Sequence, residues 1–276
     1  MRIDLHNHTP RCNHANGTPL EFANKASKLG IDIYGFACHA PMNFDTDYRM
    51  KLEELDEYID EISSLQNRLQ EQAQHHSHKQ AQNMQILVGL EVDFILGRED
   101  LLESKVLDAK LDYLIGSVHF LDEWGFDNPA FIAEYARCDL ESCWVRYFQS
   151  IAKMADSRAF QIVGHLDLLK VFGYCKPAKS SACEEALDLA LKAIKNANMT
   201  IELNAAGLRK KIGEIYPSKD ILQKAYDFGI PITFGSDAHD VAQVGFGYEK
   251  CVELAREVGY KKCVYYKQKQ AIEVDF

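Results

Sequence analysis

Seven short apolar runs recur along the chain, and amphipathic stretches separate most of them. The runs span residues 3–6, 32–39, 85–94, 113–120, 161–167, 200–207 and 231–239. They are apolar throughout instead of alternating with polar residues, which indicates strands buried on both faces of a parallel sheet. Seven such strands with helices between them predict an α/β fold, a seven-stranded β/α (TIM-like) barrel. Because no linker or repeat interrupts the pattern, we expect residues 1–276 to form a single domain.

Four of the stretches between the runs have the apolar spacing of amphipathic helices. They cover residues 19–30, 51–72, 184–198 and 219–229. Residues 73–83 (AQHHSHKQAQN) are polar, so we expect either the frayed end of the second helix or an inserted surface loop. We interpret the three histidines of this segment as solvated side chains, because no strand precedes them.

Charge and apolar content limit the classes of partner. A net charge of -10 disfavours binding to long nucleic acid, which needs a cationic surface. No N-terminal stretch resembles a signal peptide, and no apolar run approaches the roughly 20 residues of a membrane span, so we expect a cytoplasmic protein without a membrane segment. The eight cysteines include no CxxC pair and are predicted to be free thiols. Cys12 stands out because it lies between candidate metal ligands.

Histidines and acidic residues stand at the downstream ends of six of these runs. In a β/α barrel the C-terminal ends of the strands converge on one face, where active sites form. We therefore expect nine ligand-type side chains to meet on that face: His6, His8, His14, His39, Glu91, His119, His165, Asp237 and His239. A single histidine at a strand end is usually a core or surface residue, but the repeated placement favours a metal site.

The spacing of these residues supports the same hypothesis. His6 and His8 are two residues apart, as are Asp237 and His239, and strand periodicity puts each pair on one face. Imidazole and carboxylate ligands suit zinc, manganese and iron. Nine ligands are too many for one ion, so we expect two to three divalent metal ions (Zn, Mn or Fe), with Glu91 bridging two of them.

The order of these motifs resembles that of the polymerase and histidinol phosphatase (PHP) family. The matching segments are DLHNHTPRCNHANG, FACHAP, GLEVDF, GSVHF, GHLDLLK and GSDAH, which together cover nearly the whole chain. The chain length, the CxH of Cys12 to His14 and the segment ELNAAGLRK are most similar to the histidinol-phosphatase branch. The resemblance implies a distorted seven-stranded barrel with three metal ions. It also implies hydrolysis of the small molecule L-histidinol phosphate to L-histidinol in histidine biosynthesis.

The resemblance further implies how the ligands are shared among the ions. The first ion would be held by His6, His8, Glu91 and Asp237, the second by Glu91, His39 and His119, and the third by His14, His165 and His239. A hydroxide bridging two ions at the Glu91 and Asp237 sites would attack the phosphorus, so no serine or cysteine nucleophile is required.

Two cations are candidates for binding the substrate phosphate. Arg209 follows the sixth strand, and its planar guanidinium can bind phosphate through two hydrogen bonds. The resemblance places a phosphate-binding arginine at the same position. Lys170, just after GHLDLL, is the second candidate.

Metal-bound histidines usually donate their other ring nitrogen to a carboxylate or a carbonyl. Asp4, Asp93, Asp167 and Asp240 lie close in sequence to the candidate ligands, and each is equally compatible with a structural role. The sequence does not mark the general acid or the side chains that would recognise the imidazole and amino groups of the substrate.

Two other functions compete with this interpretation. A PHP phosphoesterase acting on nucleotides, oligonucleotide ends or phosphotyrosine would use the same metal centre. A non-catalytic metal-binding barrel would be expected to lack a ligand or Arg209, and none is missing from the sequence. Both a monomer and a homodimer are compatible with the sequence.

Overall fold

Seven parallel strands form the central sheet of the computed structural model, which describes residues 1–76, 84–174, 176–177 and 179–276. Their order in the sheet is β1 (Ile3–Asp4), β2 (Ile33–His39), β3 (Gln85–Asp93), β4 (Tyr113–Ser117), β7 (Ile162–Val163), β8 (Thr200–Asn204) and β9 (Ile232–Gly235). The Leu5 amide donates to the Phe234 carbonyl at 2.9 Å, and Asn7 forms a parallel bridge with Ala238. The first and last strands therefore meet, and the predicted seven-stranded β/α barrel is confirmed.

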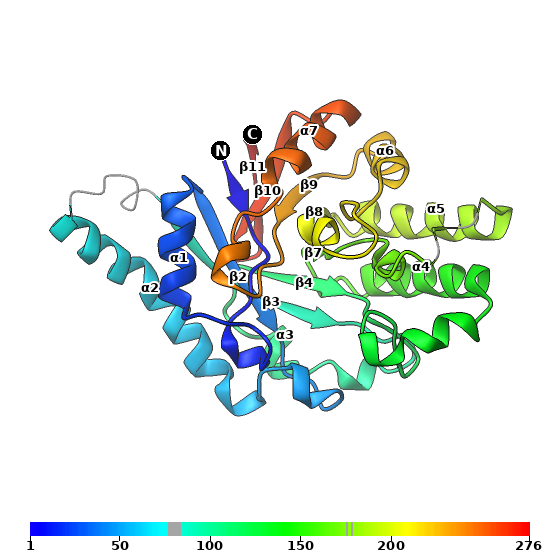
Figure 1. Ribbon diagram of the computed structural model, residues 1–276, viewed down its shortest axis with the longest axis horizontal. Helices are drawn as coiled ribbons and strands as arrows, with labels where there is room; N and C mark the ends of the chain where they lie inside the picture. Colours follow the sequence, from blue (N-terminus) through cyan, green and yellow to red (C-terminus); the bar gives the residue numbers. More distant parts are fainter. Residues whose placement is uncertain (77–83, 175, 178) are drawn as a thin grey trace.

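Helices surround this sheet, with α1 and α2 on one side and α4 and α5 on the opposite side (Figure 1). They are α1 (Pro19–Lys28), α2 (Leu55–His76), α3 (Ser104–Leu107), α4 (Leu140–Asp156), α5 (Ser181–Asn196), α6 (Lys219–Asp227) and α7 (Tyr248–Val258). All four predicted helices are present, and α2 runs on through residues 73–76. The rest of the polar segment, 77–83, lies outside the described residues. None of the helices in the described ranges combines the length and apolar content needed to cross a membrane.

Short 3-10 helices follow several strands and hold some of the side chains near the C-terminal end of the barrel. They are η1 (Pro10–Cys12), η2 (Thr46–Tyr48), η3 (Leu52–Glu54), η5 (Glu99–Leu101), η6 (Pro129–Ala136), η7 (Leu168–Lys170), η8 (Ala205–Arg209) and η9 (Val241–Gln243). A small antiparallel hairpin, β5 (Phe120–Leu121) and β6 (Trp124–Gly125), extends from the end of β4.

A second antiparallel hairpin, β10 (Lys262–Lys267) and β11 (Gln270–Asp275), was not predicted from the sequence. The Tyr266 hydroxyl donates to the Gln161 carbonyl at 3.0 Å, and the Lys269 amide donates to the Asp112 carbonyl at 2.8 Å. Gln161 and Asp112 immediately precede β7 and β4. The hairpin therefore lies at the N-terminal end of the barrel, opposite the end where the candidate ligands follow the strands.

The Tyr113 side chain fills the interior of the barrel. It is fully buried, and its hydroxyl donates to the Leu5 carbonyl at 2.6 Å. Two glycines give it room: a Cβ atom on Gly35 would lie 2.1 Å from the Tyr113 hydroxyl, and one on Gly89 would lie 2.5 Å from its ring. Gly35 and Gly89 therefore face the interior, and this fixes which face of β2 and β3 points inward.

The same face carries candidate ligands further along these strands. Side chains on one face of a strand recur every second residue, so Glu91 and Asp93 share the inward face of Gly89. His39 shares that of Gly35, and it stands directly across from Glu91 in the register of β2 and β3. Packing around Tyr113 at the centre of the barrel thus determines that these groups point into its C-terminal end.

Filling the space beside Tyr113 is expected to destabilise the protein. We predict that Gly89→Ala lowers the free energy of unfolding by about 1–3 kcal/mol, because the new methyl group clashes with the ring. Urea unfolding followed by circular dichroism measures this change. In a double-mutant cycle with Tyr113→Leu, which shortens the facing side chain, the cost of Gly89→Ala should fall. An equal cost in both backgrounds would contradict this packing.

Candidate metal centre

The structure brings all nine predicted ligand side chains to the C-terminal end of the barrel. They come from six strand ends: His6, His8 and His14 follow β1, His39 ends β2, Glu91 lies in β3, His119 follows β4, His165 follows β7, and Asp237 and His239 follow β9. His6, His8, Glu91, His119 and His165 are buried. His14 is the most exposed of the set, and it lies at the outer edge of the cluster.

The Glu91 carboxylate stands at the centre of this cluster. Its Oε2 lies 3.2 Å from His6 Nε2, 3.6 Å from His8 Nε2 and 3.1 Å from His39 Nδ1. Its Oε1 lies 2.9 Å from His165 Nε2 and 3.5 Å from His119 Nε2. Each oxygen therefore faces a different set of imidazoles, which is the arrangement that a carboxylate bridging two metal ions requires.

Potential ligand atoms within 4.8 Å of one another form three groups of side chains from the nine positions. These groups are His6 with His8 and Asp237, Glu91 with His119 and His165, and His8 with His39 and His239. The His14 ring stacks on the His239 ring, with centroids 4.6 Å apart, and so lies beside the third group.

This grouping differs from the one that the family resemblance implied. The structure places His165 beside Glu91 and His119, not beside His14 and His239, and it places His39 beside His8 and His239. The reason is strand order. β7 is the neighbour of β4, so His165 comes next to His119, whereas β2 is the neighbour of β1, so His39 comes next to His8.

The pKa values of the cluster shift in both directions. Burial lowers the pKa of His6 and His119, but the charges of Glu202 and Glu91 raise the pKa of His6 well above its usual value, and those of Asp93 and Glu91 raise the pKa of His119 to about 10. Burial raises the pKa of the Glu91 carboxyl, but the charges of His6, His39 and His119 outweigh this effect and hold the pKa well below its usual range. Burial holds the pKa of the His39 and His239 imidazoles well below the usual value. Carboxylates and neutral imidazoles are the forms that bind metal ions.

A second layer of side chains orients the imidazoles. His6 Nδ1 lies 2.8 Å from Glu202 Oε1, and His119 Nδ1 lies 2.6 Å from Asp93 Oδ1. Asp93 is also bound by Arg49, whose charge, with that of His119, overcomes the effect of burial and lowers the Asp93 pKa to about 2. Asn204 donates to both Glu202 and Asp237, at 3.1 and 3.2 Å, and so links two parts of the centre.

Sequence reasoning found only part of this layer. Of the four aspartates considered, Asp93 contacts a candidate ligand ring, whereas Asp4 binds Ser236 and the Gly245 amide. Glu202 and Arg49 were missed. The signal for Glu202 is a carboxylate between the apolar residues Ile201 and Leu203 of a predicted buried strand, where a charge needs a partner.

The two predicted phosphate-binding cations have different surroundings. Arg209 lines the cavity above the cluster, and its Nη2 donates to the carbonyls of Ser236 and Asp237 at 3.0 and 2.9 Å. Its Nη1 is buried and has no hydrogen-bond partner in the described part of the chain. The guanidinium of this cavity-lining residue therefore keeps one donor that no described protein group occupies.

Lys170, in contrast, is fully buried and does not line the cavity. Its ammonium lies 2.9 Å from Asp167 Oδ2 and donates to the Ile215 carbonyl at 3.1 Å. The structure therefore does not bring Lys170 to the place where the sequence analysis expected it, because the charge of Asp167 holds it inside the fold.

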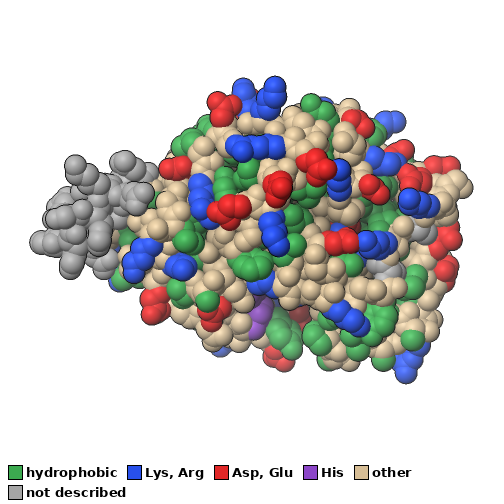
Figure 2. Space-filling view, turned by 45° about the horizontal axis from the view of Figure 1, so that its top comes forward, with side chains coloured by type: hydrophobic (Ala, Val, Ile, Leu, Met, Phe, Trp, Pro, Cys, Tyr) green, Lys and Arg blue, Asp and Glu red, His purple; other side chains and the backbone are tan. Residues whose placement is uncertain are grey.

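The cavity above the cluster has a volume of about 490 Å³. Besides the candidate ligands and Arg209, its walls carry aromatic rings and two further carboxylates: Tyr48, Phe120, Phe131, Tyr216, Asp45 and Asp127. Figure 2 shows histidine at a hollow near the lower edge of the molecule, with hydrophobic side chains beside it. The hollow is wide enough for a small molecule and opens directly onto the candidate metal centre.

The fold and this cluster together define a β/α-barrel protein with a candidate metal centre of the hydrolase type. The family model of the PHP domain matches residues 4–206, and the chain belongs to that family. It is 40% identical over 258 residues to a Deinococcus radiodurans protein named "Probable histidinol-phosphatase", with 93% of each chain covered. It is 33% identical to the histidinol-phosphatase of Bacillus subtilis, over 92% of this chain and 99% of that one.

Solved structures share the fold at lower identity. The histidinol phosphate phosphatase of Lactococcus lactis, in complex with Zn, L-histidinol and phosphate, superposes with a TM-score of 0.78 at 20% identity, and 98% of each chain is covered. This similarity shows that the described part of the chain has the same barrel fold as that protein.

Removing the central carboxylate is expected to disrupt metal binding. We predict that Glu91→Gln, which keeps the size of the side chain, weakens metal affinity. Loss of a residue that only orients a ligand costs about 10–100-fold in affinity, and loss of this ligand should cost at least as much. Elemental analysis and chelator competition on metal-loaded protein measure this effect. Glu273→Gln, at an exposed position of β11 on the opposite end of the barrel, is the matched control. Unchanged metal content and affinity in Glu91→Gln would contradict the central position of this carboxylate.

Proposed function

We propose that this chain, acting as a single domain over residues 1–276, is a metal-dependent phosphomonoesterase that hydrolyses L-histidinol phosphate to L-histidinol and phosphate. The observation that carries the proposal is the cluster of nine ligand-type side chains around Glu91 at the mouth of a PHP-family barrel. The relatives named as histidinol-phosphatases match over nearly the whole chain, which supports this substrate and a role in histidine biosynthesis.

We further propose that the nine side chains hold two to three divalent ions, zinc, manganese or iron. The donor set of imidazoles and carboxylates fits these metals, and the orphaned His239 Nε2 and His8 Nε2, buried without hydrogen-bond partners in the described residues, fit ligand positions. Divalent ions in such a site supply an activated water and neutralise the charge of the phosphate. In this proposal Glu91 and Asp237 would be the carboxylates that hold the ions.

The other groups of the cavity complete the proposal. Arg209, which lines the cavity and has an unpaired Nη1 donor, would bind the non-bridging oxygens of the phosphate. Its position is fixed by the carbonyls of Ser236 and Asp237, so little side-chain entropy is lost when phosphate binds.

Other residues that line the cavity suit a cationic substrate with a flat ring. The Asp127 carboxylate lines the cavity, and no hydrogen bond or ion pair joins it to another described side chain. It follows Phe126, whose amide donates to the His119 carbonyl at 3.1 Å, so the backbone holds it close to the cluster. The exposed rings of Tyr48 and Phe131 also line the cavity. We assign Asp127 to the substrate ammonium and these rings to the imidazole.

Phosphate release from a panel of esters tests the proposed substrate. Metal-loaded protein should hydrolyse L-histidinol phosphate with a much higher kcat/KM than AMP, p-nitrophenyl phosphate or a short 5′-phosphorylated DNA. Removal of the metal with a chelator should abolish the activity. If another ester is preferred, the metal-dependent chemistry stands and the assigned substrate is wrong.

Substitution of Asp127 tests how the substrate is selected. We predict that Asp127→Asn lowers kcat/KM for L-histidinol phosphate by about 10–100-fold, the value of one charge-assisted hydrogen bond of about 1.5–3 kcal/mol. Hydrolysis of p-nitrophenyl phosphate, which has no ammonium group, should change little. Arg209→Ala is the contrasting variant, because it should slow every ester alike. Equal losses on both esters in Asp127→Asn would rule out ammonium binding by this residue.

A further inference from the structure

Two buried thiols lie behind the candidate metal centre and are not among the nine ligand positions. Cys12 ends η1 and Cys38 lies in β2, and both side chains are fully buried. Thr9 joins them: its hydroxyl donates to Cys38 Sγ at 3.1 Å, and Cys12 Sγ donates to the Thr9 carbonyl at 3.1 Å. The thiols are therefore held in fixed positions by the chain that leads away from His8.

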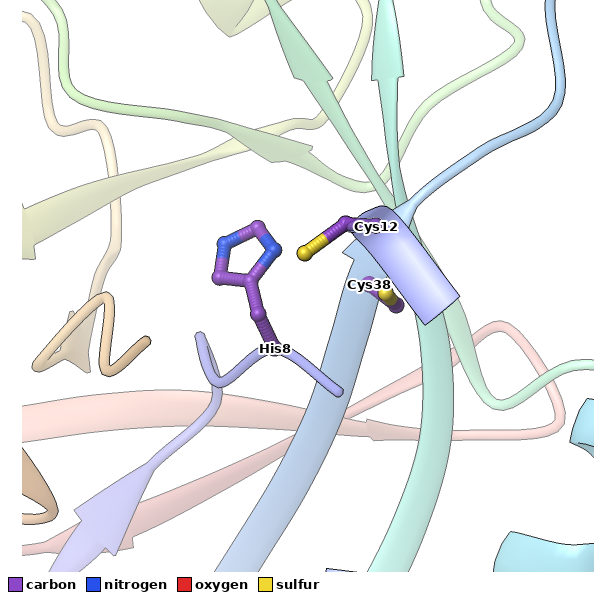
Figure 3. A group of neighbouring side chains, drawn as sticks. All are labelled: His8, Cys12 and Cys38. Carbon is purple, nitrogen blue, oxygen red and sulfur yellow. The ribbon is translucent and has the colours of Figure 1, made fainter. Parts of the chain in front are cut away.

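Both sulfur atoms face His8. The potential ligand atoms of His8, Cys12 and Cys38 all lie within 4.8 Å of one another. Figure 3 shows the ring nitrogen next to the carbon that carries Cβ, which is Nδ1, turned toward the sulfur atoms. The other nitrogen, Nε2, lies 3.2 Å from Asp237 Oδ1, on the side of the metal centre.

Five of the six other candidate histidines have an oxygen atom beside their Nδ1 atom, and for His39 this atom is Glu91 Oε2 at 3.1 Å. Besides Glu202 at His6 and Asp93 at His119, the Cys12 carbonyl lies 2.7 Å from His14 Nδ1 and the Asp237 carbonyl 3.2 Å from His239 Nδ1. His8 Nδ1 is buried and has no hydrogen-bond partner, oxygen or sulfur, among the described residues, and the two thiols are the groups toward which it is turned. His165 Nδ1 shares this condition, but only His8 faces a pair of thiols.

We propose that Cys38, held by Thr9 and Cys12, is a positioning residue that accepts the Nδ1–H of His8 in place of the usual carboxylate or carbonyl. A proton fixed on Nδ1 leaves the lone pair on Nε2, which points at Asp237 and Glu91 and is the atom available to a metal ion. Sulfur is a weak acceptor, so it holds the ring in one tautomer without the charge of a carboxylate. The inference rests on the proposed metal-dependent function.

Metal affinity, measured by chelator competition, tests this assignment. We expect Cys38→Ala to bind its most affected ion about 10–100-fold more weakly than the unchanged protein, the usual cost of losing such a partner. Cys38→Asp and Cys38→Ser, which restore an acceptor, should recover most of the affinity. Cys263→Ala removes a fully buried thiol from β10, in a different part of the core, and should leave metal affinity unchanged. The circular dichroism spectrum of each variant checks that it folds.

Native metal affinity in Cys38→Ala would overturn the proposal. It would also be overturned if Cys38→Asp and Cys38→Ser bound the metal ion as weakly as Cys38→Ala does. The absorption spectrum of the cobalt(II)-loaded protein gives a second readout. A positioning thiol predicts no thiolate-to-cobalt charge-transfer band in the near ultraviolet. A band that disappears in Cys38→Ala would mean that the sulfur is a ligand, which contradicts the assigned role. Neither readout depends on the substrate, so both remain decisive if the protein prefers another phosphate ester.

Discussion

The candidate metal centre depends on one buried carboxylate, that of Glu91. A carboxylate in the interior is unfavourable unless opposite charges or hydrogen-bond donors surround it. Here five imidazoles from four other strand ends approach its two oxygens within 2.9–3.6 Å. The position of Glu91 follows from the packing of Tyr113 against Gly89, because strand alternation then points residue 91 into the mouth of the barrel. The packing of the barrel core therefore determines where the central carboxylate of the candidate metal centre lies.

The surroundings of the cluster are charged in layers. Glu202 and Asp93 lie behind the imidazoles of His6 and His119, and Arg49 lies behind Asp93. Each layer compensates the charge of the one inside it, so that Glu91 and Asp93 remain ionised and imidazole rings keep fixed orientations. The surroundings of His8 differ, because the groups behind its ring are the thiols of Cys12 and Cys38 instead of carboxylates. The described side chains thus enclose the centre on the side of the strands, and it opens toward the cavity that Arg209 and Asp127 line.

Much of this arrangement could be predicted from the sequence. The seven apolar runs identified the strands, and the histidines and acids at their ends identified the cluster, because both signals are local. Which side chains group together as ligands of the same metal ion could not be predicted in the same way. Whether His165 lies beside His119 or beside His239 depends on the order of strands in the sheet, which is a property of the closed barrel. Lys170 was misplaced for a related reason, since its partner Asp167 is visible in the sequence but its burial is not. The hairpin β10–β11 was missed because its alternating, lysine-rich residues differ from the buried runs.

Anomalous X-ray diffraction from crystals of the metal-loaded protein, recorded at the absorption edge of the bound metal, tests the central claim most directly. The account predicts two peaks on either side of Glu91, one beside His6, His8 and Asp237 and one beside His119 and His165, with any third peak beside His39 and His239. Peaks that leave Glu91 without a metal on either oxygen would contradict the claim that this carboxylate organises the centre.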